Sequence, residues 1–267
     1  SSSQIYIMSK TTEHSDNLIP LSEYEDTVPA IIEPSNIITK IPDFPERIVL
    51  CFFQDAIKSI CDDDNIIGHT GSEIGLNPIY KLTFNDMPIA VMHAGMGAPL
   101  SGAFLDEVIA MGADKIIACG GAGVLDSSIE VGDVIVPNSA IRDEGTSFHY
   151  LPPSREVQAH PDGVKACVDT LEAHDIPYQI GKTWTTDAIY RETPAKIKRR
   201  RAEGALTVEM ETSAFFAIAQ FRKVTFGQFL YGGDDVSAED WDSRAWHKKT
   251  GVREKLLWLA IEATTRL

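Results

Sequence analysis

The sequence predicts an α/β protein of one domain, in which a central mixed β-sheet is flanked by helices. The first observation is that strand-like segments rich in β-branched residues alternate with helical segments from Arg47 onward. The second is that Gly, Pro and Asp bound most of these segments. The third is the composition, because 267 residues with 43% hydrophobic and 24% charged side chains form the balance of a globular domain. A chain of this length buries a core large enough to fold without disulfides.

Residues 1–43 form an N-terminal extension that differs from the rest of the chain. They are rich in Ser, Thr, Glu, Asp and Pro and carry only short apolar patches, such as Ile31-Ile32. We expect this extension to be partly disordered or to pack on the core. The remaining residues, 44–267, are predicted to form the domain.

Seven segments predict strands because they combine β-branched or apolar runs with Gly, Pro or Asp at their ends. They are residues 47–53 (RIVLCFF), 88–94 (PIAVMHA), 115–121 (KIIACGG), 133–137 (DVIVP), 177–184 (PYQIGKTW), 205–211 (ALTVEME) and 225–233 (TFGQFLYGG).

Helices are predicted between these strands. Residues 99–111 place apolar side chains on one face, and Gly112 is a typical helix stop. Residues 213–221 are nearly all apolar, which predicts a short buried helix. Residues 252–266 carry the apolar stripe of an amphipathic closing helix, and the basic run at 196–201 (KIKRRR) predicts a solvent-exposed helix face.

The charge of the chain argues against two classes of partner. With 24 Lys and Arg against 39 Asp and Glu, the formal net charge is −15. Nucleic acids and anionic membranes bind through basic surfaces, so neither is expected as a partner. No apolar run approaches the roughly 18 residues of a membrane span, and the N-terminus lacks the regions of a secretory signal. We therefore expect a cytoplasmic protein that binds small molecules.

No metal is expected from the cysteines and histidines. Cys51, Cys61, Cys119 and Cys167 stand far apart and form no CxxC pair. The seven histidines form no HExxH or HxH cluster. The pattern is typical of buried structural thiols rather than of a metal centre.

Two glycine-rich turns follow predicted strands. Residues 93–99 (HAGMGAP) precede a helix, and residues 119–123 (CGGAG) follow the next strand. Ligands of α/β proteins usually bind at the carboxyl ends of strands, where glycines let them approach backbone N–H groups. Neither turn has the GxGxxG or GxxxxGK[ST] spacing, so no nucleotide cofactor is expected. Taken alone, each turn is equally compatible with a structural role.

Glu209 and Glu211 stand two residues apart at the end of a predicted strand, so their carboxylates should point to the same side. They lie between apolar residues, where two like charges are costly unless a donor compensates them. A sugar diol is a suitable donor, since one carboxylate can accept two hydroxyl groups. The alternative is a structural pair that forms salt bridges or caps the next helix.

Asp234 and Asp235 follow an apolar strand and two glycines. Mutual repulsion and partial burial raise the pKa of one of two adjacent acids toward neutrality, which suits a general acid. The alternative is that they cap the element that follows.

Together and in this order, these motifs resemble the nucleoside phosphorylase family, which includes purine nucleoside phosphorylases, uridine phosphorylases and methylthioadenosine nucleosidases. The resemblance runs from about Arg47 to the C-terminus. Its most specific match is ALTVEMETSAFF (205–216), supported by HAGMG (93–97), IIACGGAGVL (116–125) and TDAIY (186–190). It implies a nucleoside phosphorylase-like fold and an enzyme that cleaves the N-glycosidic bond of a nucleoside.

The resemblance also implies site roles, residue by residue. Glu211 would bind the ribose hydroxyls with support from Glu209. The acid that protonates a departing purine falls on Asp234 by gap-free counting from Glu211, whereas the residue that usually follows this acid favours Asp235. The remaining positions are the sugar contacts Met96 and Met210, the base-bordering residues Gly121, Ala122 and Gly123, and Ile189 in the place of a base-stacking aromatic.

The sequence departs from the family at the phosphate site. Phe53 and Ile57 stand at the expected Gly and Arg positions, and Ala118 replaces a further arginine. Because cationic forks dominate phosphate recognition, phosphate is only a possible co-substrate, with Lys58, Arg142 or a nest of backbone N–H groups as substitutes for the missing arginines. Phosphorolysis therefore competes with hydrolysis by water, and a catalytically silent nucleoside-binding or storage protein is a third alternative.

Two further expectations follow from the resemblance. The family's pyrimidine-reading Gln and Arg have no obvious counterpart in residues 190–193, which favours a purine. Members of the family form dimers and trimers of dimers, so a homo-oligomer, either dimer or hexamer, is expected.

Overall fold

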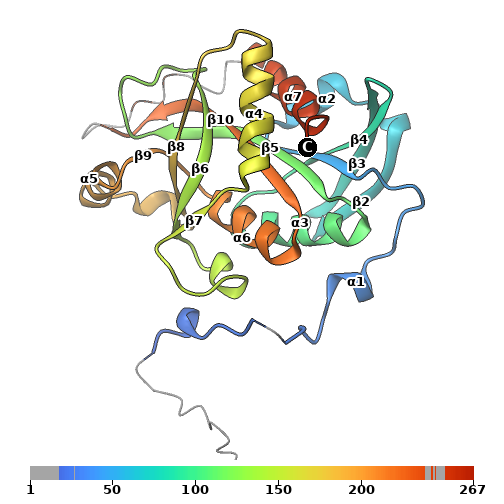
Figure 1. Ribbon diagram of the computed structural model, residues 1–267, viewed down its shortest axis with the longest axis horizontal. Helices are drawn as coiled ribbons and strands as arrows, with labels where there is room; N and C mark the ends of the chain where they lie inside the picture. Colours follow the sequence, from blue (N-terminus) through green and yellow to red (C-terminus); the bar gives the residue numbers. More distant parts are fainter. Residues whose placement is uncertain (1–17, 27, 238–241, 243, 245–249) are drawn as a thin grey trace, which may run out of the picture.

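The fold is described from a computed structural model covering residues 18–26, 28–237, 242, 244 and 250–267. Its centre is a mixed sheet, as the sequence predicts (Figure 1). The strands are β1 (Arg47–Cys51), β2 (Ile66–Ser72), β3 (Gly75–Phe84), β4 (Met87–His93), β5 (Lys115–Val124), β6 (Val134–Asp143), β7 (Glu156–Gln158), β8 (Tyr178–Thr186), β9 (Ala205–Glu209) and β10 (Thr225–Asp235).

The sheet combines an open wing with a closed ring of strands. Its order is β10-β6-β8-β9-β5-β1-β4-β3-β2, and β7 pairs with β6. Because β10 also pairs with β5, the strands β5, β9, β8, β6 and β10 close on themselves. Parallel pairs such as β1–β5 and antiparallel pairs such as β5–β9 occur side by side.

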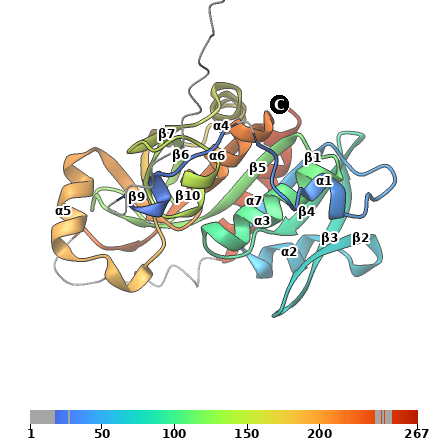
Figure 2. The ribbon, with the colours of Figure 1, turned by 90° about the horizontal axis from the view of Figure 1, so that it is seen from below.

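Helices cover both sides of the sheet (Figures 1 and 2). One side carries α2, α4 and α7, and the other carries α3 and α6. The helices are α1 (Pro34–Ile37), α2 (Gln54–Ile60), α3 (Ala98–Met111), α4 (Pro161–Ala173), α5 (Pro194–Ala202), α6 (Thr212–Arg222) and α7 (Thr250–Thr264).

All seven predicted strands and all predicted helices are present, but the sequence analysis missed several elements. The missed strands are β2, β3 and β7, and the missed helices include α2 and α4. The β2–β3 hairpin is mostly exposed or half-buried, so its sequence lacks a regular apolar alternation. A proline inside β3, Pro78, further obscures the strand pattern.

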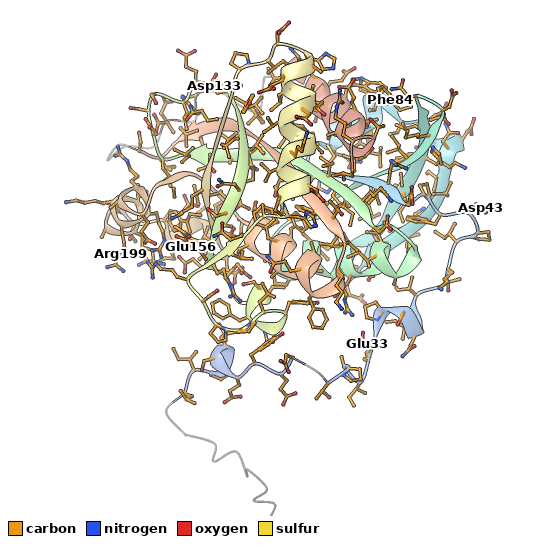
Figure 3. The ribbon with its side chains drawn as sticks, viewed as in Figure 1. Glu33, Asp43, Phe84, Asp133, Glu156 and Arg199 are labelled. Atoms are coloured by element: carbon orange, nitrogen blue, oxygen red, sulfur yellow. The ribbon has the colours of Figure 1, made fainter. Side chains whose placement is uncertain are left out.

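Two predicted helices behave as expected in burial. Eight consecutive residues of α6, from Thr212 to Ala219, are buried, so this helix packs on all sides. The α5 face is exposed at Lys198, Arg199 and Arg201, and Arg199 projects outward from the helix in Figure 3. Arg200 is the exception, because it is 7% exposed and pairs with Asp143 and Glu203.

The described part of the N-terminal extension contacts the domain. The Tyr24 hydroxyl donates a hydrogen bond to the Tyr150 carbonyl at 3.1 Å. Glu33, labelled in Figure 3, forms an ion pair of 3.2 Å with Arg222 at the end of α6. Residues 1–17 and Thr27 lie outside the described residues.

Three further findings concern the part of the chain that the structure describes. None of its helices is long and apolar enough to cross a membrane. It holds no group of three or more His, Cys, Asp or Glu residues arranged for a metal ion. All four cysteines have free thiols.

Candidate active site

A cavity of about 280 Å³ opens where β1, β5, β9 and β10 end. It brings together all the sequence-predicted site residues except Asp235, which is not among its lining residues. The lining residues are Phe52, Phe53, Met96, Gly120, Gly121, Ala122, Gly123, Ile189, Glu192, Val208, Glu209, Met210, Glu211, Gln228, Leu230, Gly233, Asp234 and Arg253.

Glu209 is held at the junction of β9 and α6. Its Oε2 accepts hydrogen bonds of 2.7 Å from the backbone N–H groups of both Glu211 and Thr212, and its Oε1 accepts one of 2.7 Å from the Thr185 hydroxyl. Glu209 therefore caps the N-terminus of α6, which the sequence analysis considered only as an alternative. Burial raises the pKa of Glu209.

Glu211 does not belong to the strand, contrary to the sequence prediction. β9 ends at Glu209, and Glu211 has φ −137° and ψ −27° as the residue before α6. Its side chain is 7% exposed, and its Oε1 accepts a hydrogen bond of 3.1 Å from the Gly97 N–H. Burial and the negative charge of Glu209 raise the pKa of Glu211 to about 8. The two carboxylates still line one cavity, because the turn at residues 209–212 brings Glu211 back toward it.

The backbone conformation of the turn before α3 explains why two of its residues are glycines. Gly95 and Gly97 have φ values of +84° and +81°, in the left-handed region that L side chains rarely adopt. A Cβ at Gly95 would also lie 3.2 Å from the Phe104 ring. This backbone shape directs the Gly97 N–H at Glu211, so the glycine turn and the acidic motif form one unit.

A buried network behind the cavity fixes the start of α6. The Ser213 N–H donates to Thr185 Oγ1 at 2.9 Å, and the Ser213 hydroxyl donates to Glu144 Oε1 at 2.8 Å. Glu144 is 5% exposed and also accepts the Ser147 N–H at 2.9 Å. Glu144 could not be identified from the sequence, since nothing near it in the chain indicates its partners.

Asp234 and Asp235 point to different surroundings. Asp234 lines the cavity above Gly123, where an added Cβ would lie 3.5 Å from Asp234 Oδ1. Asp235 turns away, because its Oδ1 accepts the Ser237 N–H at 2.8 Å and its backbone pairs with Asp242. Adjacent in sequence, these two acids are therefore not a carboxyl pair within the cavity.

A different acid accompanies Asp234. Glu192 is half-buried, lines the same cavity, and follows the 3-10 turn Ile189–Arg191. Burial and the negative charge of Asp234 raise the pKa of Glu192 to about 7. The sequence analysis missed Glu192, because it lies some forty positions before Asp234 and no pattern links the two.

One cationic side chain lines the cavity among the residues that the structure describes. Arg253 of α7 lies 2.9 Å from Asp55 through its Nη2 and 4.6 Å above the centre of the Phe53 ring. The two substitutes suggested by the sequence are not lining residues. Arg142 is 5% exposed and bonds internally, for example to Ser147 Oγ at 2.8 Å, and Lys58 borders a separate surface depression.

Aromatic rings fill the turn after β1. Phe53 is 1% exposed and meets Tyr231 edge-on at 5.6 Å between ring centres. The Phe52 ring lies over Gly120, where an added Cβ would be only 2.7 Å from it. This turn therefore contributes apolar volume where the resemblance places the family's phosphate site, at the position where the sequence lacks the expected Gly and Arg.

Comparisons with known proteins identify the family and the fold of this chain. The profile of the Phosphorylase superfamily matches residues 46–256. A guanosine phosphorylase of Halorubrum lacusprofundi is 27% identical over 241 residues, covering 86% of this chain and 93% of that protein. The crystal structure of a Vibrio fischeri uridine phosphorylase has a similar fold, with a TM-score of 0.69, 21% identity, and coverage of 90% of this chain and 96% of that one. That of a Bacteroides thetaiotaomicron AMP nucleosidase has a TM-score of 0.68 and 22% identity, covering 85% and 90%.

Proposed function

This chain belongs to the phosphorylase superfamily, and on that premise we propose that it cleaves the N-glycosidic bond of purine nucleosides. The observation that carries the proposal is the arrangement of acids in one cavity. Two buried carboxylates, Glu209 and Glu211, line this cavity together with Asp234, which lies above Gly123. A nucleoside presents a diol and a base at its two ends, which are the groups that such acids bind and protonate.

At the sugar end, Glu211 is proposed to accept hydrogen bonds from the ribose hydroxyls. Its position is set by the Gly97 N–H and by the cap that Glu209 places on α6. Glu209 supports this role by positioning, because its own oxygens are already engaged by the backbone and by Thr185. Met96 and Met210 line the same cavity and would offer apolar contact to the sugar ring.

At the base end, Asp234 is proposed as the general acid. Cleavage of the bond leaves electron density on the base and positive charge on the sugar. A carboxyl that protonates the imidazole ring of the purine lowers this barrier, and carboxylates near the diol stabilise the positive sugar. The backbone of Gly121, Ala122 and Gly123 and the side chain of Ile189 would border the base.

We propose water as the acceptor. A phosphate ion carries close to two negative charges and needs local cations. Four carboxylates line the cavity, and Arg253 is already paired with Asp55. Phe53 occupies volume in the turn after β1 and lowers the local polarity, which raises the cost of desolvating an anion.

A nucleoside panel tests this proposal. Guanosine, inosine, adenosine and uridine are incubated with the enzyme, with and without phosphate, and free base, ribose and ribose 1-phosphate are measured. The proposal expects base and ribose from purine nucleosides. Calorimetric binding of a nucleoside without any turnover would instead identify a silent binding protein, and ribose 1-phosphate as the main product would identify phosphate as the acceptor.

We also propose that the protein works in the cytoplasm as a homo-oligomer. The four free thiols support a reducing compartment. Apolar side chains exposed near the site and on the β2–β3 hairpin support assembly, since Met96 is 62% exposed, Leu76 76% and Ile74 94%. Light scattering coupled to size exclusion would measure the number of subunits.

A further inference from the structure

We propose that Glu192 is a second catalytic carboxyl, which shares one proton with Asp234 and delivers it to the departing base. This inference rests on the proposed cleavage of nucleosides. It replaces the adjacent pair of aspartates suggested by the sequence with a pair drawn from two distant elements of the fold.

Glu192 is presented to the cavity by a well-anchored segment. Before it, the Arg191 N–H donates to the Ala188 carbonyl at 2.9 Å. After it, the Thr193 hydroxyl caps α5 by accepting the Lys196 N–H at 3.4 Å. Helix α5 packs beside β9 (Figure 2). Glu192 therefore reaches the cavity from the link between the 3-10 turn and α5, whereas Asp234 reaches it from the end of β10.

Glu192 differs from the acids of the sugar end in its partners. Its half-buried carboxyl forms no hydrogen bond or ion pair with the residues that the structure describes, whereas Glu209 and Glu211 both accept backbone N–H groups. A partly buried carboxylate without a donor is costly, and a neighbouring carboxylate adds to this cost. Retaining one proton on the pair relieves both costs and leaves an O–H group available to a ligand.

The other charged groups of the cavity favour a shared proton. Glu209 and Glu211 face the cavity from the junction of β9 and α6 and place no positive charge beside Asp234 and Glu192. Arg253 faces it from α7 but is paired with Asp55, and Tyr231 of β10 packs edge-on against Phe53. Burial and the charge of Asp234 keep the pKa of Glu192 at about 7, close to the pH at which a general acid works best.

The proposed step moves one proton from the carboxyl pair to the departing base. An O–H bond of the carboxyl pair breaks and an N–H bond forms on the imidazole ring of the purine, while the electrons of the glycosidic bond pass to the base. Water adds its oxygen to C1′ of the sugar and releases a proton. The half-exposed Glu192 takes a proton back from solvent or from that water, which restores the pair.

The test compares Glu192→Gln with Glu107→Gln. Glu107 on α3 is a matched control, because it is also half-buried beside an aspartate, Asp106, and burial also raises its pKa, but it does not line the cavity. Two substrates are used: guanosine, whose base needs a proton to leave, and 7-methylguanosine, whose base already carries a positive charge.

For the wild type and Glu107→Gln, we expect guanosine turnover to fall as the pH rises through about 7, where Glu192 loses its proton. Glu192→Gln should lower guanosine turnover at neutral pH by about 10-fold or more and abolish this fall, while turnover of 7-methylguanosine changes less than about two-fold. Infrared titration provides a readout without substrate, because a protonated carboxyl has a C=O band that disappears when the group ionises. The wild type should show such a band that disappears near pH 7, and Glu192→Gln should lack it.

An unchanged pH profile in Glu192→Gln, or an equal loss on both substrates, would overturn the inference. A wild type that binds nucleosides but cleaves none of them would overturn the proposed function, and with it the catalytic role of the pair. In that case the infrared titration would still decide separately whether the two carboxyls share a proton.

Discussion

Where we propose that the sugar binds, the carboxylates of Glu209 and Glu211 accept N–H groups from the backbone, and both side chains are less than a tenth exposed. Where we propose that the base binds, which we call the base end, Glu192 and Asp234 are half-buried, and Glu192 has no hydrogen-bond donor among the described residues. The difference is one of preorganisation. Acids that must hold a fixed ligand geometry are built into the secondary structure, whereas acids that must exchange a proton keep contact with solvent.

The largest expected effect lies at the base end. Asp234→Asn should lower the turnover of purine nucleosides by roughly 100-fold or more, because it removes the carboxyl proposed to protonate the base. Asp235→Asn is the matched control and should retain most of the activity, since Asp235 bonds to the Ser237 N–H instead of lining the cavity. Steady-state kinetics on inosine measure both. Full activity in Asp234→Asn would show that Asp234 is not the general acid, and the contrast between the two groups of acids would then have no catalytic basis.

A smaller loss is expected at the sugar end. Above about pH 8, where its carboxyl is ionised, Glu211→Gln should weaken nucleoside binding or turnover by at least about 1.5 kcal/mol, the scale of a hydrogen bond to a charged group, or roughly ten-fold. A 2′,3′-dideoxynucleoside should lose about as much with the wild-type enzyme. If neither change alters the kinetics, Glu211 serves only to hold the turn before α3.

The same glutamate should make stability depend on pH. Its pKa of about 8 in the folded protein lies above the ordinary carboxyl value, so the folded state holds the proton more tightly than the unfolded chain. The resulting stabilisation is complete below the ordinary pKa and is lost as the pH rises through about 8. The melting temperature should therefore fall by a few degrees from mildly acidic to mildly alkaline buffer. Calorimetry of Glu211→Gln should give a flatter profile, and an identical profile would assign the change to another group.

The contrast between the two ends also explains what the sequence could predict. Glu209, Glu211 and Gly97 lie in short contiguous motifs whose spacing reflects local backbone geometry, so their place beside a common cavity could be predicted from the sequence. The strand that holds Glu209 was nevertheless predicted two residues too long, because the hydrogen bonds that end it come from its own carboxylate. The alternation of apolar and polar residues does not show that a side chain will accept the backbone N–H groups that follow it.

The positions of Glu192 and Arg253 depend on contacts between segments that are distant in the sequence. Glu192 meets Asp234 only because α5 packs beside β9, and Arg253 reaches the cavity only because α7 crosses the sheet near β1 and β5. One acid does raise the pKa of another in this cavity, but the pair is Glu192 and Asp234. The sequence suggested Asp234 and Asp235, which are neighbours in the chain but do not both line the cavity.

The smallest expected effect is that of phosphate on the rate of cleavage. Cleavage should be no more than a few-fold faster in millimolar phosphate than in phosphate-free buffer, because Phe52 and Phe53 fill the turn after β1 and Arg253 is paired with Asp55.

The informative variant is Arg253→Gln, assayed with and without phosphate. If water is the acceptor, the ratio of the two rates stays near one in both proteins, whatever the variant does to the rate itself. A large, saturable phosphate effect in the wild type that disappears in Arg253→Gln would instead show that this single guanidinium leaves Asp55 to bind the anion. Both ends of the cavity would then retain their proposed roles, but the reaction would be a phosphorolysis.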